Sequence, residues 1–246
     1  GVLSLVIIRR QELPFSGARS DIGFNPEIKN FLKLGFPIAL QDMLVNISFL
    51  ILCAIVNGIG LEASSGYGIA QKVTAFVMLI PSALMLSMSA FVAQNVGAGK
   101  EERAKKAMVT GMLIGAGIGV FIFAVSFFGG EIPAALFTSD PAYIARAAEY
   151  LRGFSPEAVL TCLVFSYIGY FNGHGKTMPV MVQGITSSFL VRVPLSYLFS
   201  IQPGANLVTI GAAVPITSVY GILFFTVCFG AFQKKMRMGQ APQACL

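Results

Sequence analysis

Charged residues are scarce in this sequence, and this scarcity excludes an ordinary soluble domain. Asp, Glu, Lys and Arg make up 11% of the 246 residues, and hydrophobic residues make up 55%. Soluble domains carry about 25% charged residues, because a surface that faces water needs them. Lipid is therefore the expected surroundings of most of the chain, and the composition predicts an integral membrane protein.

Histidine and cysteine, which build most metal and redox sites, are also rare. The single histidine, His174, lies between two glycines without a partner ligand nearby, so we interpret it as a solvated loop residue and expect no metal site. The four cysteines show neither CxxC pairing nor metal-ligand spacing, and we interpret them as small apolar residues. No motif combines a nucleophile, a base and an orienting group, so we expect neither an enzyme nor a cofactor.

The net charge of +6 does not indicate nucleic-acid binding. Nucleic-acid binding requires Lys and Arg gathered on one exposed face, whereas here they lie between apolar runs. The turn Gly97-Ala98-Gly99-Lys100 is also not a phosphate-binding loop, because that motif needs a Ser or Thr after the lysine and Glu101 stands there. We therefore expect neither nucleic acid nor a nucleotide as a partner.

Six segments are long and apolar enough to cross a membrane, which takes about 20 helical residues. They are 34–57, 67–95, 107–128, 154–171, 178–199 and 207–232. The predicted fold class is all-α, a polytopic membrane bundle of six transmembrane helices. Between the third and fourth segments, residues 141–151 alternate apolar and charged faces at helical spacing, which predicts a short amphipathic helix on the outer surface.

The sequence before the first span divides into two parts. Residues 1–8 are apolar but too short to cross, and Arg9 and Arg10 follow them, which is the reverse of the charge order in a signal peptide. We interpret residues 1–8 as the end of a preceding transmembrane helix and residues 9–33 as a basic connection. Residues 34–233 then form the six-helix unit, and residues 234–246 form a tail.

Lys and Arg are concentrated in every second connection between the spans. They precede the first span, follow the second, follow the fourth through Lys176, and follow the sixth. Because cytoplasmic connections carry an excess of Lys and Arg, these connections are predicted to lie in the cytoplasm. The chain is thus predicted to be a multi-pass protein of the cell membrane with both ends in the cytoplasm.

Polar side chains on one face of the first span predict a binding site. Gln41, Asp42 and Asn46 lie on the same side of the helix, and the i, i+4 pair Asp42 and Asn46 is close enough to share a proton, an ion or a substrate amine. An ionised aspartate at mid-membrane costs roughly 2.5–3.5 kcal/mol, so such residues usually face a bundle interior or a wet cavity. The alternative is a hydrogen bond between helices or contact with interfacial water.

The second span contributes a further candidate binding residue, and each of the first two spans contains a proline that could act as a hinge. Met85 belongs to a methionine-rich surface that would tolerate varied ligands, although filling a core is the commoner use of methionine. Pro37 and Pro81 should kink the first and second spans, either as bending points or as static packing.

Two further features have a structural interpretation. Gly111, Gly115 and Gly119 recur every four residues, which predicts close contact between helices. Glu157 and Arg192 are the remaining charges at membrane depth, and Arg192 is expected to extend outward along its stem to the interface.

Several motifs resemble the multidrug and toxic compound extrusion (MATE) transporters, in their C-terminal lobe. The most specific is the run from Ser89 to Gly99, with Gln94-Asn95-Val96-Gly97-Ala98-Gly99 in a turn after the second span. The weaker motifs follow in the same order along the chain: Gly35-Phe36-Pro37, Leu136-Phe137-Thr138, Tyr150-Leu151-Arg152, Gly173-His174-Gly175-Lys176-Thr177 and Arg192-Val193-Pro194-Leu195.

This resemblance implies one lobe of a twelve-helix transporter with two lobes. Residues 1–8 would end helix six, residues 9–33 would be the cytoplasmic interlobe linker, and the six spans would be helices seven to twelve. A MATE transporter exports cationic or amphipathic drugs and metabolites by antiport with Na⁺ or H⁺ through alternating access. The implied partners are an N-terminal lobe of the same protein, the lipid bilayer and an organic cation substrate, with Gln41, Asp42 and Asn46 lining the cavity.

One position departs from the family, and two other functions stay open. Some members carry an acidic residue about two turns past the proline of helix seven, where this chain has Val45; its acid, Asp42, comes earlier. A flippase for lipid-linked precursors shares the two-lobe plan, but its cavity should be lined by Arg and Lys to bind pyrophosphate. A non-transporting membrane subunit is the other alternative.

Overall fold

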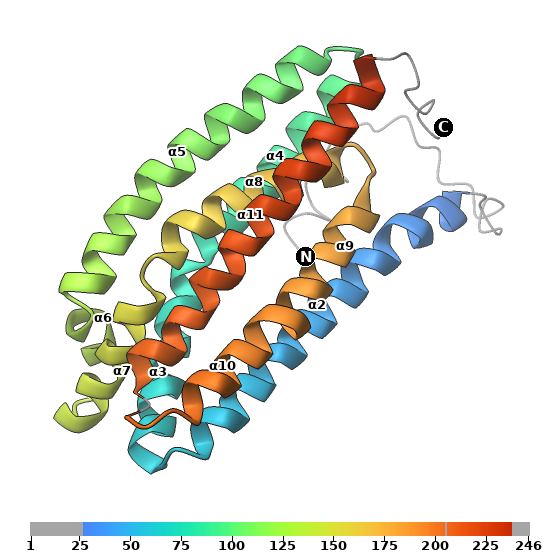
Figure 1. Cartoon of the computed structure of the whole chain (residues 1–246). Helices are drawn as coiled ribbons and strands as arrows, with labels where there is room; N and C mark the ends of the chain where they lie inside the picture. Colours follow the sequence, from blue (N-terminus) through green and yellow to red (C-terminus); the bar gives the residue numbers. More distant parts are fainter. Residues whose placement is uncertain (1–26, 205, 238–246) are drawn as a thin grey trace, which may run out of the picture.

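The structure is a computed structural model that describes residues 27–204 and 206–237, and this part of the chain consists of helices joined by short connections, without a strand (Figure 1). The prediction of an all-α membrane bundle is confirmed. The elements are α2 (Glu27–Asn57), α3 (Leu61–Val77), α4 (Leu79–Gly97), α5 (Glu101–Phe128), α6 (Glu131–Ala135), α7 (Pro141–Phe154), α8 (Glu157–Gly173), α9 (Thr177–Thr186), the π-helix η2 (Ser187–Arg192), α10 (Val193–Ser200) and α11 (Leu207–Arg237).

Five helical runs in the described residues are long and apolar enough to cross a membrane, and a bent pair makes a sixth. The five runs are α2, α3 with α4, α5, α9 through α10, and α11. The sixth consists of α7 and α8, which meet at a bend of 48°. The expected fourth span, 154–171, corresponds to α8, which passes the same length and apolarity test only together with α7. The structure does not describe three of the segments assigned from the sequence, or most of them. These are the helix end at residues 1–8, most of the connection at 9–33 and most of the tail at 234–246.

Helix α7 is amphipathic as predicted and lies at the end of the bundle opposite the basic side chains, so its place on the outer side of the membrane stays a prediction (Figure 1). Its apolar face, including Ala147, Ala148 and Leu151, is buried, and the helix packs against α3 and α11. Glycines permit this approach: a Cβ atom on Gly66 would clash with Arg146 of α7, and one on Gly211 would lie 2.6 Å from the Tyr150 carbonyl oxygen. Because backbones touch there, α7 is part of the core.

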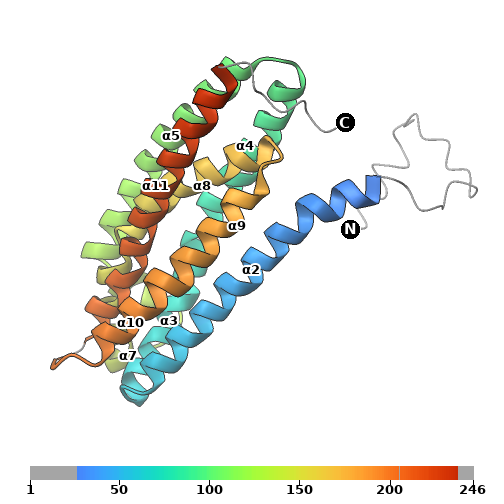
Figure 2. The same cartoon turned by 45° about the vertical axis from the view of Figure 1, so that its right-hand side comes forward.

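The glycine series of α5 forms a close interface with α4 and α8, as predicted. Gly111, Gly115 and Gly119 are all buried. A Cβ atom on Gly115 would lie 2.9 Å from Cys162 Cβ, and one on Gly119 would lie 2.6 Å from the Ala158 carbonyl oxygen. In the two views α5 and α2 lie at opposite edges of the bundle, with α2 running beside α9 and α10 (Figures 1 and 2).

Two turns of identical form end α4 and α8. Each reads Gly-x-Gly-Lys, and the second glycine, Gly99 or Gly175, takes a positive φ of 70° or 64° that other residues rarely adopt. In both turns the lysine amide donates to a carbonyl oxygen five residues earlier, at 2.8 and 2.9 Å. The intervening residue is Ala98 in one turn and His174 in the other, with nearly the same backbone angles, φ −87° and ψ 5° against φ −86° and ψ 3°.

Basic side chains gather at one end of the bundle. This end holds the starts of α2, α5 and α9 and the end of α11, and the other end holds the start of α3, with α7 and the end of α10 (Figure 1). The basic residues at the first end are Lys29, Lys33, Lys100, Arg103, Lys105, Lys106, Lys176, Lys234 and Lys235. The prediction that this end faces the cytoplasm rests on this charge pattern.

Candidate functional site

A buried arginine lies between α2 and the fifth span. Arg192 is the last residue of η2 and is 8% exposed. Its Nη1 donates to Ser48 Oγ at 3.1 Å, and its guanidinium carbon lies 4.3 Å from the centroid of the Phe49 ring, a cation–π contact. The prediction that Arg192 extends outward to the interface was therefore wrong, because its side chain points into the bundle.

A buried carboxylate lies nearby at the start of α8. Glu157 is 6% exposed, and its Oε1 accepts hydrogen bonds from Thr161 Oγ1 at 2.5 Å and from Ser218 Oγ of α11 at 2.8 Å. Ser218 lies about 16 Å along α11 from Leu207, at about 1.5 Å per residue. That distance is about half the thickness of the hydrocarbon core of a bilayer, roughly 30 Å.

Glu157 and Arg192 attract each other electrostatically but are not in direct contact. Arg192 interacts electrostatically with Glu157, Tyr150 and Tyr67. No ion pair within 4.0 Å joins the two charges among the described residues. We call Glu157, Arg192 and the side chains that interact with them the Glu157–Arg192 cluster, and we include the two buried serines about one turn on either side of Arg192. These side chains are Ser48, Phe49, Tyr67, Tyr150, Thr161 and Ser218, with Ser188 and Ser196 as the two serines.

Several polar atoms of this cluster are buried without a partner. They are Glu157 Oε2, Arg192 Nε, and the hydroxyl groups of Tyr150, Ser188 and Ser196. Leaving a buried polar group unpaired costs about 1–3 kcal/mol, and more when the group is charged. These five atoms, two of which belong to the charged groups themselves, make the cluster a candidate site for a proton, a small ion or water.

Pro194 explains why the helix presents Arg192 in this way. A proline lacks the backbone N–H that would bond to the carbonyl four residues earlier, and its ring would clash with that carbonyl. The wider π-helical turns of η2, which ends two residues before Pro194, accommodate this missing hydrogen bond. Such π-helical turns are rare and frequently occur at functional sites. Ser188 and Ser196, about one turn on either side of Arg192, are fully buried.

The predicted polar face of α2 is split by the structure. Gln41 is half-buried and packs on α9, where a Cβ atom on Gly184 would lie 2.5 Å from Gln41 Cγ. Asp42 and Asn46 are exposed on the surface of the lobe. The Asn46 amide donates to the main-chain oxygen of Asp42 at 2.8 Å and not to its carboxylate. The carboxylate of Asp42 therefore faces outward from this lobe, so its binding role stays a prediction.

The other predicted residues lie apart from that face. Met85 is half-buried and packs against the apolar cluster of α8, α9 and α11 that includes Phe171 and Val180. Pro37 lies inside α2, which continues through it as a helix. Pro81 interrupts its span: α3 ends at Val77, whose carbonyl the proline ring would meet, and α4 begins at Leu79. Whether either proline acts as a hinge stays a prediction.

The candidate site residues predicted from the sequence included neither the Glu157 and Arg192 pair nor His174. Glu157 and Arg192 carry opposite charges in separate apolar spans, and intramembrane ionisable residues usually pair or line a pathway, so this signal was available. His174 was interpreted as a solvated loop residue, and this was wrong. Its side chain is 5% exposed and its ring nitrogen Nε2 lies 3.0 Å from Glu101 Oε2.

Comparison with known proteins identifies the family. The family model named MatE matches residues 37–198, which is more than half of the chain. The chain belongs to the MatE family. Its curated relatives include multidrug resistance proteins, so MatE proteins are a family of multidrug efflux transporters embedded in the membrane.

Individual relatives are distant and about twice as long. "Probable multidrug resistance protein YpnP" of Bacillus subtilis is 25% identical over 205 residues, which are 83% of this chain and 46% of that protein. "FAD transporter" of Shewanella oneidensis is 24% identical, over 74% of this chain and 40% of that protein. The chain thus spans less than half the length of these MatE relatives.

Solved structures of MATE transporters share the fold. "Crystal structure of MATE in the straight conformation" aligns with a TM-score of 0.81 at 18% identity, over 94% of this chain and 52% of that one. A MATE in complex with MaL6 aligns with a TM-score of 0.82, over 95% of this chain and 55% of that one. At these identities the likeness establishes the arrangement of helices and not the chemistry of the site.

Proposed function

We propose that this chain is the C-terminal half of a secondary active transporter that exports cationic or amphipathic drugs or metabolites. Export runs in exchange for Na⁺ or H⁺ and by alternating access, and the cavity is completed by an N-terminal lobe of the same protein. The names of the multidrug resistance relatives support this substrate class. The exposed carboxylate of Asp42, on the same helix face as Asn46, supports a surface that attracts organic cations.

The observation that carries the proposal is the buried charge pair in the Glu157–Arg192 cluster. A carboxylate at mid-membrane is costly unless it is neutralised or paired, and Glu157 keeps one oxygen without a partner. A proton or a Na⁺ ion bound there would complete the coordination begun by Thr161 and Ser218, whose hydroxyl oxygens are ligands suited to a hard cation. Binding or release of that cation changes the net charge beside Arg192.

That change of charge provides a physical link to alternating access. With Glu157 ionised, the pair is neutral and Arg192 is attracted toward α8; with Glu157 neutralised, Arg192 is left as an uncompensated buried cation. An uncompensated buried charge costs several kcal/mol, and this cost favours a rearrangement of the helices that carry the two groups. Arg192 is bonded to Ser48 of α2, so the rearrangement would reach the helix that carries Gln41, Asp42 and Asn46.

The test is transport by the full-length protein in proteoliposomes. Efflux of a cationic dye such as ethidium is driven in turn by a pH gradient and by a Na⁺ gradient. We expect Glu157→Gln to lower the coupled flux at least about tenfold, an effect of about 1.4 kcal/mol, with dye binding retained. Asp42→Asn is expected instead to weaken dye binding, because the carboxylate lies on the exposed face.

Matched controls make the result decisive. Glu62→Gln removes an exposed carboxylate that lies 3.7 Å from Arg146, and it should leave the flux unchanged. The coupling role of Glu157 fails if Glu157→Gln keeps the flux and its ion dependence. The assignment of the α2 face fails if Asp42→Asn and Asn46→Ala leave transport and binding unchanged. A protein that moves a flavin dinucleotide but no cation would contradict the substrate class.

A further inference from the structure

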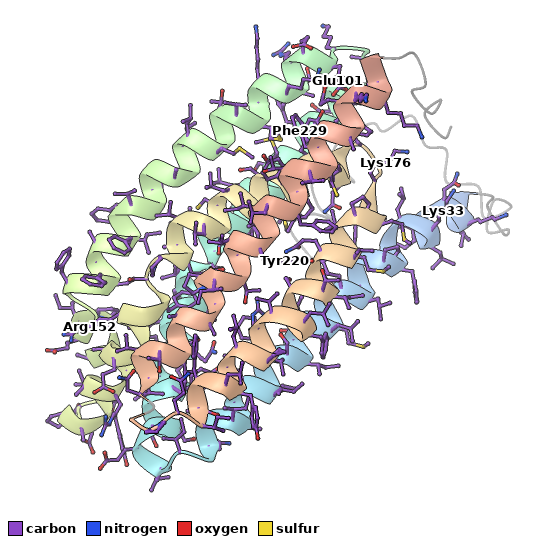
Figure 3. The ribbon with its side chains drawn as sticks, in the orientation of Figure 1. Lys33, Glu101, Arg152, Lys176, Tyr220 and Phe229 are labelled. Atoms are coloured by element: carbon purple, nitrogen blue, oxygen red, sulfur yellow. The ribbon has the colours of Figure 1, made fainter. Side chains whose placement is uncertain are left out.

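A second buried polar group joins three helices at the basic end of the bundle. His174 follows the last residue of α8, and its Nε2 lies 3.1 and 3.0 Å from the two carboxylate oxygens of Glu101, at the start of α5. The His174 side chain is 5% exposed and that of Glu101 is 27% exposed. Figure 3 labels Glu101 at the end where α5 begins and α11 ends. We call these two residues the Glu101–His174 pair.

Helix α11 closes over this pair. Tyr170 Oη donates to Glu101 Oε1 at 2.6 Å, and Gln233 Nε2 donates in turn to Tyr170 Oη at 3.0 Å. The ring of Phe232 lies edge-on to the His174 ring, with 5.2 Å between their centroids. One connected network of hydrogen bonds and ring contacts therefore holds α5 and α11 to the end of α8.

The hydrogen bonds of His174 require a proton beyond that of a neutral imidazole. Its Nδ1 lies 2.8 Å from the main-chain oxygen of Tyr170, and its Nε2 faces the Glu101 carboxylate. Both partners are acceptors, whereas a neutral imidazole has a single N–H to donate. Both contacts are satisfied only when the pair carries one added proton, either on His174 or shared with Glu101.

Two helix dipoles favour the ionised form of this pair, a histidinium beside a carboxylate. His174 is the C-cap residue of α8, where the helix end carries partial negative charge and stabilises a cation. Glu101 lies in the first turn of α5, where the helix end carries partial positive charge and stabilises an anion. The position of each residue thus stabilises the charge that the hydrogen bonds require.

Few other charged groups compete for this proton. Tyr170 is the titratable neighbour from α8 itself, α11 contributes Gln233 and Phe232 to the contact, and α4 contains no titratable side chain. Glu102, next to Glu101, pairs with Lys105 at 2.9 Å. Within residues 27–204 and 206–237, Glu101 is the charged group in hydrogen-bonding contact with His174.

We propose that the Glu101–His174 pair is a proton-binding site that latches α5 and α11 to the end of α8. Closing the latch takes up one proton from solution, and opening it releases that proton. Because the closed form holds the proton, acid stabilises closure and the stabilisation is lost as the pH rises. This site goes beyond the proposed function and does not depend on Glu157.

The chain contains its own evidence that a variant of His174 can fold. The turn that ends α4 has the same form and nearly the same backbone angles as the turn that ends α8, and Ala98 stands where His174 stands. Alanine is therefore compatible with this backbone. His174→Ala should remove the proton site while the turn itself is preserved.

The test is the thermal unfolding midpoint of the full-length protein at about pH 6 and about pH 8.5, on either side of the histidine range. Wild type is compared with His174→Ala, Glu101→Gln and their double variant. We expect each single variant to lose about 2–4 °C more at the acidic pH than at the basic pH. The double variant should lose no further pH-dependent stability, because the two residues share one proton.

Two controls separate the proton from mere packing. Tyr170→Phe removes a hydrogen bond to Glu101 but keeps the pair, so it should lower the midpoint equally at both pH values. Glu102→Gln removes the neighbouring carboxylate and should not alter the pH dependence. The proposal is overturned if His174→Ala or Glu101→Gln lowers the midpoint by the same amount at both pH values, or if only one of them changes the pH dependence.

Discussion

The closest backbone approach of α5 gives a quantitative prediction for Gly119→Ala. The added Cβ atom would lie 2.6 Å from the Ala158 carbonyl oxygen and 2.8 Å from Val159 Cα, both in α8. Real Cβ atoms do not approach other heavy atoms so closely, and neither backbone atom can rotate away. Helix α5 must therefore move from α8, which loosens the contacts that Gly111 and Gly115 make along the same interface.

The magnitude follows from a comparison within the same helix. Gly117 lies two residues earlier on the exposed face, and no atom lies within 4 Å of its added Cβ. Both Gly→Ala changes gain about 0.5–1 kcal/mol of helix propensity, so this gain cancels between the two variants. The remaining difference is the cost of overpacking, about 1–3 kcal/mol. Gly119→Ala should be less stable than Gly117→Ala by that amount.

Thermal unfolding followed by a thiol-reactive fluorophore measures this difference. Cys162 of α8 is 1% exposed and lies against Gly115, so its labelling reports loss of the α5–α8 interface. At about 2–4 °C per kcal/mol, the midpoint of Gly119→Ala should lie roughly 2–12 °C below that of Gly117→Ala. Equal midpoints would refute the reasoning, because they would mean that α5 and α8 are not in backbone contact at Gly119.

The remaining predictions concern two local structures. Pro194→Ala restores a backbone N–H and should let η2 return to α-helical geometry. This turns Arg192 away from Ser48 and should lower the coupled flux. The control Pro179→Ala, in the first turn of α9 where no such hydrogen bond is lost, should leave the flux unchanged. Asp140→Ala removes the N-cap of α7, whose Oδ1 accepts from the Ala142 amide at 2.9 Å. It should cost about 0.5–2 kcal/mol of unfolding free energy, seen as a lower thermal midpoint, whereas Asp140→Asn should retain most of the stability.

The sequence by itself determined the class of the protein and the position and order of its apolar helices. Length and apolarity of a transmembrane helix are local properties, so each span could be located before any contact was known. The glycine series of α5 was local in the same sense, since a four-residue repeat places all three glycines on one face. The Gly-x-Gly-Lys turns and the charge pattern of the connections were also visible in the sequence.

Tertiary structure alone decided which polar groups meet. Glu157 and Ser218 are far apart in the chain, and so are Glu101 and His174; their contacts depend on how each helix is rotated about its axis and where it crosses its neighbours. Those rotations are set by close backbone contacts such as Gly119 against α8 and by the widened turns before Pro194. Because hydropathy does not encode rotation, the outward extension of Arg192 and the solvated histidine were both wrong predictions. The polar face predicted on α2 is split, with Gln41 packed on α9 and Asp42 exposed, and the buried charges of this lobe lie elsewhere.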